Sequence, residues 1–216
     1  MVNKPLRIIL LLEKQAKRYG LPLLEKKYGK NTPFKILIAC VLSLRTKDAV
    51  TAEASERLFK AADTPIKISK LPQGNIEKLI YPVGFYRNKA KAVKKIAEKI
   101  ISDFSGKVPG TLAGLLSLYG VGRKTANLVL GLGYNIPSIC VDTHVYRISN
   151  RLGLVKTKNP AETEFALYKL IPKRYWIKIN SILVIFGQNI CVPVSPFCSK
   201  CDVYDCCKRI GVKKHR

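Results

Sequence analysis

Acidic residues are scarce in this sequence. Its 216 residues contain 14 Asp and Glu against 39 Lys and Arg, which gives a formal net charge of +25 at pH 7. The basic residues are spread along the whole chain, so a polyanion is the expected partner. Nucleic acid is the first candidate. An anionic membrane or an RNA-rich surface stays open as an alternative because it attracts the same charge. Many lysines, such as those of residues 89–100, also fit solvated helix faces.

Long apolar runs are missing as well. The longest purely apolar segments, such as residues 36–42, are far too short to span a bilayer, and the start of the chain has no secretory signal pattern. We therefore expect a soluble, intracellular protein that is not bound to a membrane. An apolar content of 47% is enough for a buried core that needs no disulfides.

No segment alternates apolar and polar residues in the way that a half-buried β-strand does. Eight segments instead fit a 3.6-residue period or a continuously buried helix, and turn residues separate them. The sequence therefore predicts an all-α fold. The predicted helical segments are residues 6–20, 34–44, 48–62, 76–83, 89–104, 111–120, 123–134 and 179–191.

Two glycines two residues apart, Gly120 and Gly122, separate two of the predicted helices. They permit a tight turn, and the amides at the following helix start form an anion site, which a DNA phosphate would suit. On its own, such a turn is more often an ordinary corner between helices. Lys124 lies in the first turn of the second helix, where the helix dipole disfavours a cation. It is either a phosphate contact or a nucleophilic amine.

Asp142 precedes another run with helical periodicity, and its default role is that of an N-cap. A carboxylate held by helix amides stays ionised, so the same residue can also stabilise a developing positive charge. His144 is one of two histidines, and we interpret it as a packing or hydrogen-bonding residue of the first turn.

Five of the seven cysteines lie between residues 191 and 207, and four of them have the spacing C-x6-C-x2-C-x5-C. Disulfides are not expected in a reducing compartment. Zinc sites usually contain two close cysteine pairs, and only one such pair is present, so the spacing favours iron over zinc without excluding zinc. Cys206 is the spare cysteine of the segment, whereas Cys40 and Cys140 are expected in the core.

The segments GVGRKTA at residues 120–126 and VDTH at residues 141–144 resemble the helix-hairpin-helix DNA glycosylase superfamily, and specifically the endonuclease III family. The resemblance extends from about residue 34 to residue 207. It implies two helical domains with a DNA-binding cleft between them. Residues 26–136 would form a six-helix domain with the hairpin, and residues 1–25 and 137–216 a helical domain around a 4Fe-4S cluster. The implied cluster ligands are Cys191, Cys198, Cys201 and Cys207.

The same resemblance implies a bifunctional DNA glycosylase and AP lyase of base excision repair that removes oxidised pyrimidines. Lys124 would attack the anomeric carbon of a flipped-out nucleotide, Asp142 would stabilise the positive sugar, and β-elimination would nick the strand. The implied partner is double-stranded DNA with a damaged base or an abasic site, bound by a monomer in a prokaryotic or archaeal cytoplasm, at the nucleoid. The predicted DNA contacts are Gly120, Val121, Gly122, Arg123, Arg45 and Phe85.

Several positions depart from the family pattern. Arg45 stands where the family usually has a glutamine that fills the gap left by the flipped nucleotide, and Tyr119 stands where proline is common. Phe85 matches a wedge position, although core packing is an equal alternative. Residues 192–197 contain no basic residue, so Lys200 and residues 213–216 would have to contact phosphate there.

Two other functions stay open at this point. Arg45 suggests a glycosylase for mismatched or otherwise modified bases. The third possibility is a non-enzymatic DNA-binding iron-sulfur protein, in which Lys124 only contacts phosphate and Asp142 only caps a helix.

Overall fold

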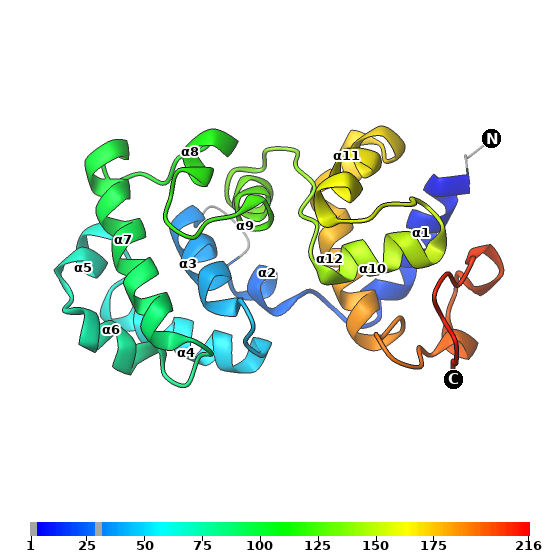
Figure 1. The fold of residues 1–216 in the computed structure, drawn as a ribbon, viewed down its shortest axis with the longest axis horizontal. Coiled ribbons are helices and arrows are strands. Elements are labelled where there is room, and N and C mark those ends of the chain that lie inside the picture. Colours follow the sequence, from blue (N-terminus) through cyan, green and yellow to red (C-terminus); the bar gives the residue numbers. More distant parts are fainter. Residues whose placement is uncertain (1–3, 29–31) are drawn as a thin grey trace. The chain divides into compact units, whose positions relative to one another are not determined.

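The computed structural model describes residues 4–28 and 32–216. Within these ranges every regular element is a helix or helical turn, which confirms the all-α fold (Figure 1). The chain divides into two compact units. The hairpin unit is Leu23–Ile136, and the cysteine unit combines the chain up to Pro22 with Pro137–Arg216. No helix in the described part of the chain is long and apolar enough to cross a membrane.

The hairpin unit is built around one helix that is apolar on nearly all sides. Eight residues of α3 are buried, and the helix packs against α4, α7 and the π-helical turn at the end of α9. The longest helix, α7, turns its apolar face to α5 and α6. The helices are α2 (Leu23–Tyr28), α3 (Pro33–Ser43), α4 (Asp48–Ala61), α5 (Pro65–Lys70), α6 (Gln73–Ile80), α7 (Tyr86–Phe104), α8 (Leu112–Leu116) and α9 (Arg123–Leu128), with the π-helical turn Val129–Gly133.

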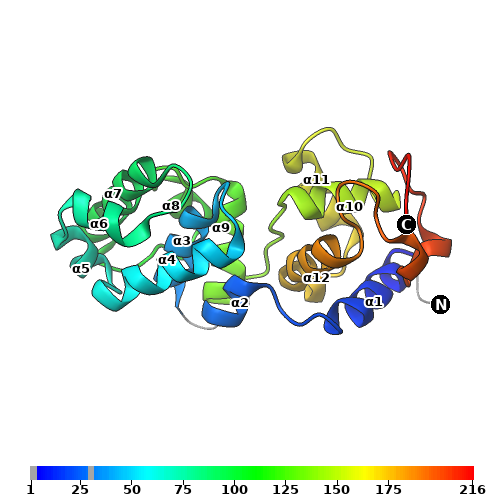
Figure 2. The same cartoon turned by 90° about the horizontal axis from the view of Figure 1, so that it is seen from below.

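The cysteine unit has α12 at its centre, with α1 and α10 packed beside it (Figure 2). Gly187 in α12 allows the close approach of α10, because a Cβ atom there would lie 2.4 Å from Nδ1 of His144 and 2.9 Å from Cδ1 of Ile148. The helices are α1 (Lys4–Lys17), α10 (Thr143–Leu152), α11 (Pro160–Leu170) and α12 (Trp176–Asn189), with 3-10 turns at Lys173–Tyr175, Cys198–Lys200 and Tyr204–Cys206.

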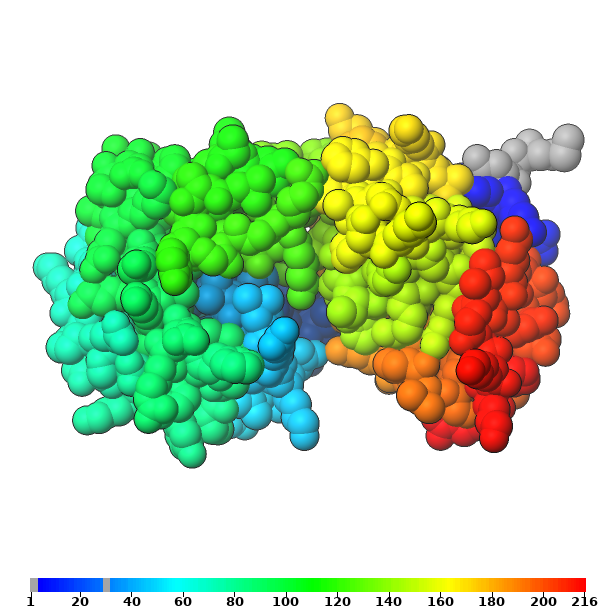
Figure 3. Space-filling model, viewed as in Figure 1, coloured from blue at the N-terminus to red at the C-terminus, as the bar shows by residue number. Residues whose placement is uncertain are grey.

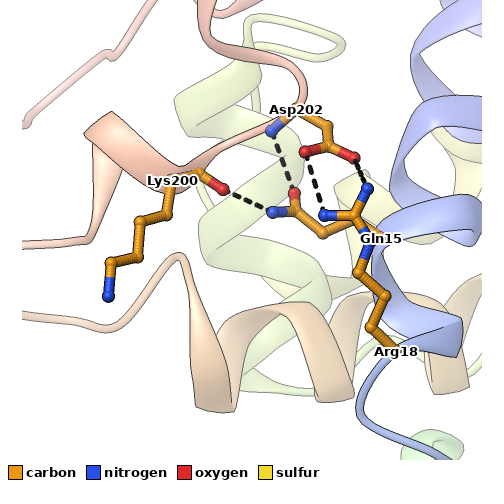
Figure 4. Close-up of polar contacts among 4 residues, drawn as sticks. All are labelled: Gln15, Arg18, Lys200 and Asp202. Carbon is orange, nitrogen blue, oxygen red and sulfur yellow. Dashed lines mark hydrogen bonds and ion pairs between the residues drawn. The ribbon is translucent and has the colours of Figure 1, made fainter.

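The N-terminal helix is fastened to the cysteine-rich segment by polar contacts (Figure 4). The buried Gln15 donates to the carbonyl of Lys200 at 2.6 Å and accepts from the amide of Asp202 at 3.1 Å. Arg18 adds a two-pronged ion pair to the Asp202 carboxylate, with N···O distances of 2.9 and 3.4 Å. The buried amide group of Gln15 binds both a carbonyl and an N–H group of the cysteine-rich segment, so it fixes how α1 and that segment align. These contacts therefore tie the start of the chain to the cysteines near its end.

Candidate active site

The turn between α8 and α9 has the geometry that its two glycines predict. Gly120 has a φ of +71°, in the left-handed region that suits glycine, and Gly122 precedes α9 as its N-cap. A Cβ atom at either glycine would meet nothing within 4 Å, so both face open space. Val121 between them is buried and anchors the turn in the core. A ligand can thus approach the backbone closely at a turn that is itself held firmly.

Lys124 is exposed in the first turn of α9. Among the described residues the structure gives its ammonium group no hydrogen bond or ion pair. Its charge lies near Cys40 of α3, which is buried as predicted; burial raises the pKa of the Cys40 thiol to about 12, and the Lys124 charge opposes that shift. Lys124 is therefore an exposed amine on a rigid helix start beside the core of the hairpin unit.

Asp142 is the N-cap of α10, as the sequence predicts. Its Oδ1 accepts hydrogen bonds from the amides of His144 at 2.9 Å and Val145 at 2.8 Å. Both bonds go to one oxygen, so the half-buried carboxylate keeps Oδ2 for another partner. Lys124 belongs to the hairpin unit and Asp142 to the cysteine unit. That they face each other across a cleft stays a prediction.

A chain of contacts leads from the Asp142 cap toward the cysteines. Nη2 of Arg147 lies 3.2 Å from Nδ1 of His144 and donates to the carbonyls of Gly187 at 3.3 Å and Cys191 at 2.9 Å. His144 is therefore a hydrogen-bonding residue of the first turn, as predicted. Arg147 was not predicted from the sequence. It joins α10 to the end of α12, where the first cysteine of the segment lies.

Arg45 and Phe85 lie together at the surface of the hairpin unit. Phe85 is 61% exposed, so the alternative that it packs in the core is wrong. The guanidinium carbon of Arg45 lies 5.9 Å from the centre of the Phe85 ring, a cation–π contact. Both residues have left-handed backbone conformations, with φ of 53° and 58°. The structure thus brings together two of the predicted DNA-contacting side chains that are 40 residues apart in sequence.

Four cysteines of the C-terminal segment surround one pocket in the cysteine unit. Its lining includes Cys191, Cys198, Cys201 and Cys207, the four residues with the predicted spacing, but not Cys206. The empty space, open solvent included, is about 390 Å³. The pocket is closed from other parts of the unit by Arg151 of α10, Phe186 of α12, Ile190 directly after α12, and Val212. The fold therefore places four of the five cysteines around one pocket and leaves Cys206 outside its lining.

Burial disfavours free thiolates in this pocket. It raises the pKa of the Cys201 thiol to about 12 and raises the pKa values of Cys198 and Cys207 as well. Hydrogen-bond donors reach two of the sulfurs: Arg151 donates to Sγ of Cys191 at 3.6 Å, and the amide of Arg209 donates to Sγ of Cys207 at 3.3 Å. A bound metal group would supply the positive charge that stabilises four buried thiolates.

The donor set is chemically suited to a metal group. Four thiolates are the usual ligand set of a 4Fe-4S cluster, which carries one thiolate on each iron. Four cysteines can also bind a single zinc ion, so the lining of the pocket by itself fits both groups. In the described ranges, the side chains as placed form no group of three or more Cys, His, Asp or Glu that could hold a metal ion.

The last residues of the chain fold back onto the cysteine-rich segment (red in Figure 3). The guanidinium carbon of Arg216 lies 3.9 Å from the centre of the Phe197 ring, and the amide of Ser199 donates to the carbonyl of Arg216 at 3.0 Å. Residues 213–216 are exposed, as is Lys200. The structure therefore places the predicted substitute basic residues beside residues 192–197, while their contact with phosphate stays a prediction.

Comparison with known proteins identifies the class that this fold and these residues define. The model of the HhH-GPD superfamily, described as base excision DNA repair protein, matches residues 38–173. The chain belongs to this superfamily, and the predicted helix-hairpin-helix fold is confirmed.

The endonuclease III family is shown by closer relatives. Endonuclease III of Thermotoga maritima is 45% identical over 183 residues, which cover 85% of this chain and 86% of that protein. A trapped endonuclease III–DNA covalent intermediate superposes with a TM-score of 0.82 at 34% identity over 97% of each chain. A thermostable thymine-DNA glycosylase superposes with a TM-score of 0.84 at 26% identity, over 95% of this chain and 96% of the other. Within the superfamily, this chain belongs to the endonuclease III family, so the predicted DNA glycosylase and AP lyase class is confirmed.

Proposed function

We propose that this enzyme removes oxidised pyrimidines from double-stranded DNA and then nicks the strand at the resulting abasic site. The exposed amine of Lys124 carries the proposal, because a Schiff base requires an amine on a rigid support near an extrahelical nucleotide. The turn of Gly120 and Gly122 supports it, since exposed amides at the start of α9 suit a DNA phosphate. The trapped complex of a relative with 34% identity supports the same chemistry for this chain.

The reaction follows from an amine and a carboxylate acting in turn. Neutral Nζ of Lys124 attacks the anomeric carbon of the flipped nucleotide, the bond from that carbon to the base breaks, and the base leaves with the bonding pair and takes up a proton. Asp142 offers Oδ2 to the positive sugar while Oδ1 remains on the α10 amides. Loss of the amine proton and ring opening give the imine. Removal of a proton from the adjacent sugar carbon then expels the 3′ phosphate by β-elimination.

We propose Cys191, Cys198, Cys201 and Cys207 as the ligands of a 4Fe-4S cluster. Their shared pocket and their spacing, which contains only one close pair, support this choice over zinc, and the position of Cys206 outside the lining supports Cys207 as the fourth ligand. When bound, the cluster supplies four iron–thiolate bonds that cross-link the segment, and base excision itself requires no electron transfer. Arg147 and Arg151 of α10 then hold the first of these cysteines in place.

A second substrate class has a specific observation in its favour. A closely similar fold belongs to another protein that is a thermostable thymine-DNA glycosylase. Arg45 supports this alternative, because a charged, long side chain beside the lesion changes which opposite base is favoured.

The enzyme is proposed to act as a monomer on one lesion at a time.

Borohydride trapping tests the proposal. Wild-type protein is incubated with duplexes that carry an abasic site, thymine glycol, or a G·T mismatch. We expect adducts on the abasic and thymine glycol duplexes, because the same imine follows base removal and direct attack on the abasic sugar. Adducts on the abasic and mismatch duplexes, but not on thymine glycol, would show that the substrate is a mismatched base and not an oxidised pyrimidine. Absence of adducts on all three would contradict the proposed imine at Lys124.

Asp142→Asn separates helix capping from catalysis. Asparagine is as good an N-cap as aspartate, so α10 and the thermal stability of the protein should be preserved. A neutral amide does not stabilise a positive sugar, so the single-turnover excision rate should fall by roughly 10²- to 10³-fold. Excision kinetics and thermal melting are measured on the same preparation. Excision at the wild-type rate would leave Asp142 with only its capping role.

A further inference from the structure

A lysine with no assigned role lies buried beneath Arg45 and Phe85. Lys89 in α7 is only 7% exposed, and its ammonium group makes three hydrogen bonds within the hairpin unit. It donates to the carbonyl of Leu42 at 2.8 Å, to Oγ1 of Thr46 at 3.0 Å and to the carbonyl of Leu44. These three acceptors use all three ammonium protons. Lys89 therefore has no proton left for a substrate, and its function must pass through the residues that it holds.

The three acceptors lie at the end of α3 and in the turn that carries Arg45. The last carbonyls of a helix lack intrahelical partners and carry the negative end of the helix dipole, so a cation is favourable there. Burial lowers the pKa of Lys89 to about 8, yet the position suits the charged form because every proton has an acceptor. An apolar side chain in the same place would leave two carbonyls and a hydroxyl without this donor.

The same contacts join the turn of Arg45 to the turn of Phe85. Oγ1 of Thr46, which accepts from Lys89, also accepts from the amide of Gly84 at 3.2 Å. The two turns approach so closely that a Cβ atom at Gly84 would lie 2.9 Å from the carbonyl oxygen of Arg45. Phe85 follows Gly84 directly, and the Arg45 guanidinium lies over its ring. Lys89 and Thr46 thus form the polar base of a surface pair made of Arg45 and Phe85.

The pair is held in a backbone conformation that it would not adopt freely. Arg45 and Phe85 both have positive φ, a backbone conformation that is unfavourable for a residue with a Cβ atom. Such conformations persist where neighbouring contacts determine them. Here the hydrogen bonds that do so converge on Lys89 and Thr46.

We propose that Lys89 is a positioning residue that sets Arg45 and Phe85 side by side as a two-residue wedge for damaged DNA. This inference rests on the proposed function, in which a nucleotide leaves the helix and a gap opens. An exposed aromatic ring can then insert between base steps, and an arginine held over that ring can stack and donate hydrogen bonds to the base opposite the gap. Neither side chain does this if its turn is free to rotate away.

The test uses binding, which does not depend on the reaction at Lys124. Lys89→Met is compared with Lys94→Met, a matched variant on the same helix that removes the same charge and one hydrogen bond, from Lys94 to the Leu71 carbonyl at 3.0 Å. For each protein the affinity for a duplex with a tetrahydrofuran abasic analogue is divided by the affinity for undamaged duplex at one salt concentration. Loss of one charge changes both affinities by the same factor, and so does a fraction of unfolded protein. The ratio of the two affinities therefore measures the contribution of the wedge to the recognition of damaged DNA.

We expect Lys89→Met to lower this selectivity roughly tenfold, while Lys94→Met keeps the wild-type value. The double variant Arg45→Ala/Phe85→Ala should lose a similar amount, and adding Lys89→Met to it should cause no further loss, because a positioning residue without its pair has nothing to position. Thr46→Val, which removes only the shared hydroxyl, should give a smaller loss in the same direction and serves if Lys89→Met does not fold.

Equal selectivity of Lys89→Met, Thr46→Val and wild type would overturn the inference, and so would a loss that adds fully to that of the double variant. The proposed function fails separately. If wild-type protein formed no borohydride adduct but Lys89→Met still lost selectivity, the wedge would stand and the catalytic proposal would fall.

Discussion

Lys124→Ala is expected to abolish borohydride-trapped adducts on the abasic duplex and to lower strand nicking by roughly 10³-fold or more. An imine needs a primary amine at the sugar, and alanine supplies none. The fold should be unaffected, because Lys124 is exposed and makes no hydrogen bond or ion pair among the described residues. Affinity for the abasic duplex should fall only by the amount that is expected when one positive charge near a phosphate is lost.

Arg123→Ala is the matched control for this experiment. It removes a positive charge from the adjacent residue of the same helix turn but leaves the amine in place. Its trapping should remain, and its binding should be weaker than that of wild type by a factor that shrinks as the salt concentration rises. Gel electrophoresis of the reduced adducts and binding at two salt concentrations measure the two effects. Full trapping by Lys124→Ala would show that another amine attacks the sugar.

Cys207→Ser is expected to reduce bound iron from about four atoms per chain to nearly none, whereas Cys206→Ser should retain the wild-type content. The two cysteines are adjacent and chemically identical, but only Cys207 lines the pocket. Because metal binding to a folded site contributes to folding, loss of the cluster should also lower the melting temperature by roughly 10 °C or more. The visible absorption of the purified proteins and iron and zinc analysis measure the difference.

The zinc alternative makes a distinct prediction for the same pair of variants. A colourless wild-type protein with one zinc ion per chain and full activity would contradict the cluster. Iron loss in Cys206→Ser but not in Cys207→Ser would instead show that the ligand set, not the metal, was assigned wrongly. Both results would leave the all-α fold and the family unchanged, since neither rests on the cysteines alone.

The helices that the sequence predicts lie in apolar segments long enough to show a period, and this includes the five-residue α8, which lies within the predicted segment 111–120. Three helices were missed: α2, α5 and α11. The first two have six residues each, too few for a periodic pattern, and α5 forms where it packs on α7. The signal for α11 was present, because Asn159 caps the helix before Pro160, and Glu162 bonds back to the amide of Lys158 at 2.9 Å. That N-cap signal was interpreted only as turn punctuation.

Sequence patterns also did not predict which of two side chains is exposed and which is buried. Phe85 is apolar and was equally compatible with the core, yet its ring lies at the surface beside Arg45. Lys89 is charged and was interpreted as part of a solvated face, yet it is buried. Its position four residues before Val93 and seven before Ile96 places it on the apolar face of α7, which was the available signal. The interpretation gave more weight to the charge of Lys89 than to its position on the apolar face of the helix.

The sequence by itself determined what depends on neighbours in the chain. The helical periods, the glycine turn before Lys124, the cap that Asp142 places on α10 and the spacing of the four cysteines all act over a few residues, so local rules suffice to predict them. Only the tertiary structure decided which side chains meet across long separations. Gln15 contacts Asp202 from 187 residues away, and Lys89 reaches Leu42, 47 residues earlier. Such contacts follow from how whole helices pack, and packing is a property of the assembled core, not of any one segment.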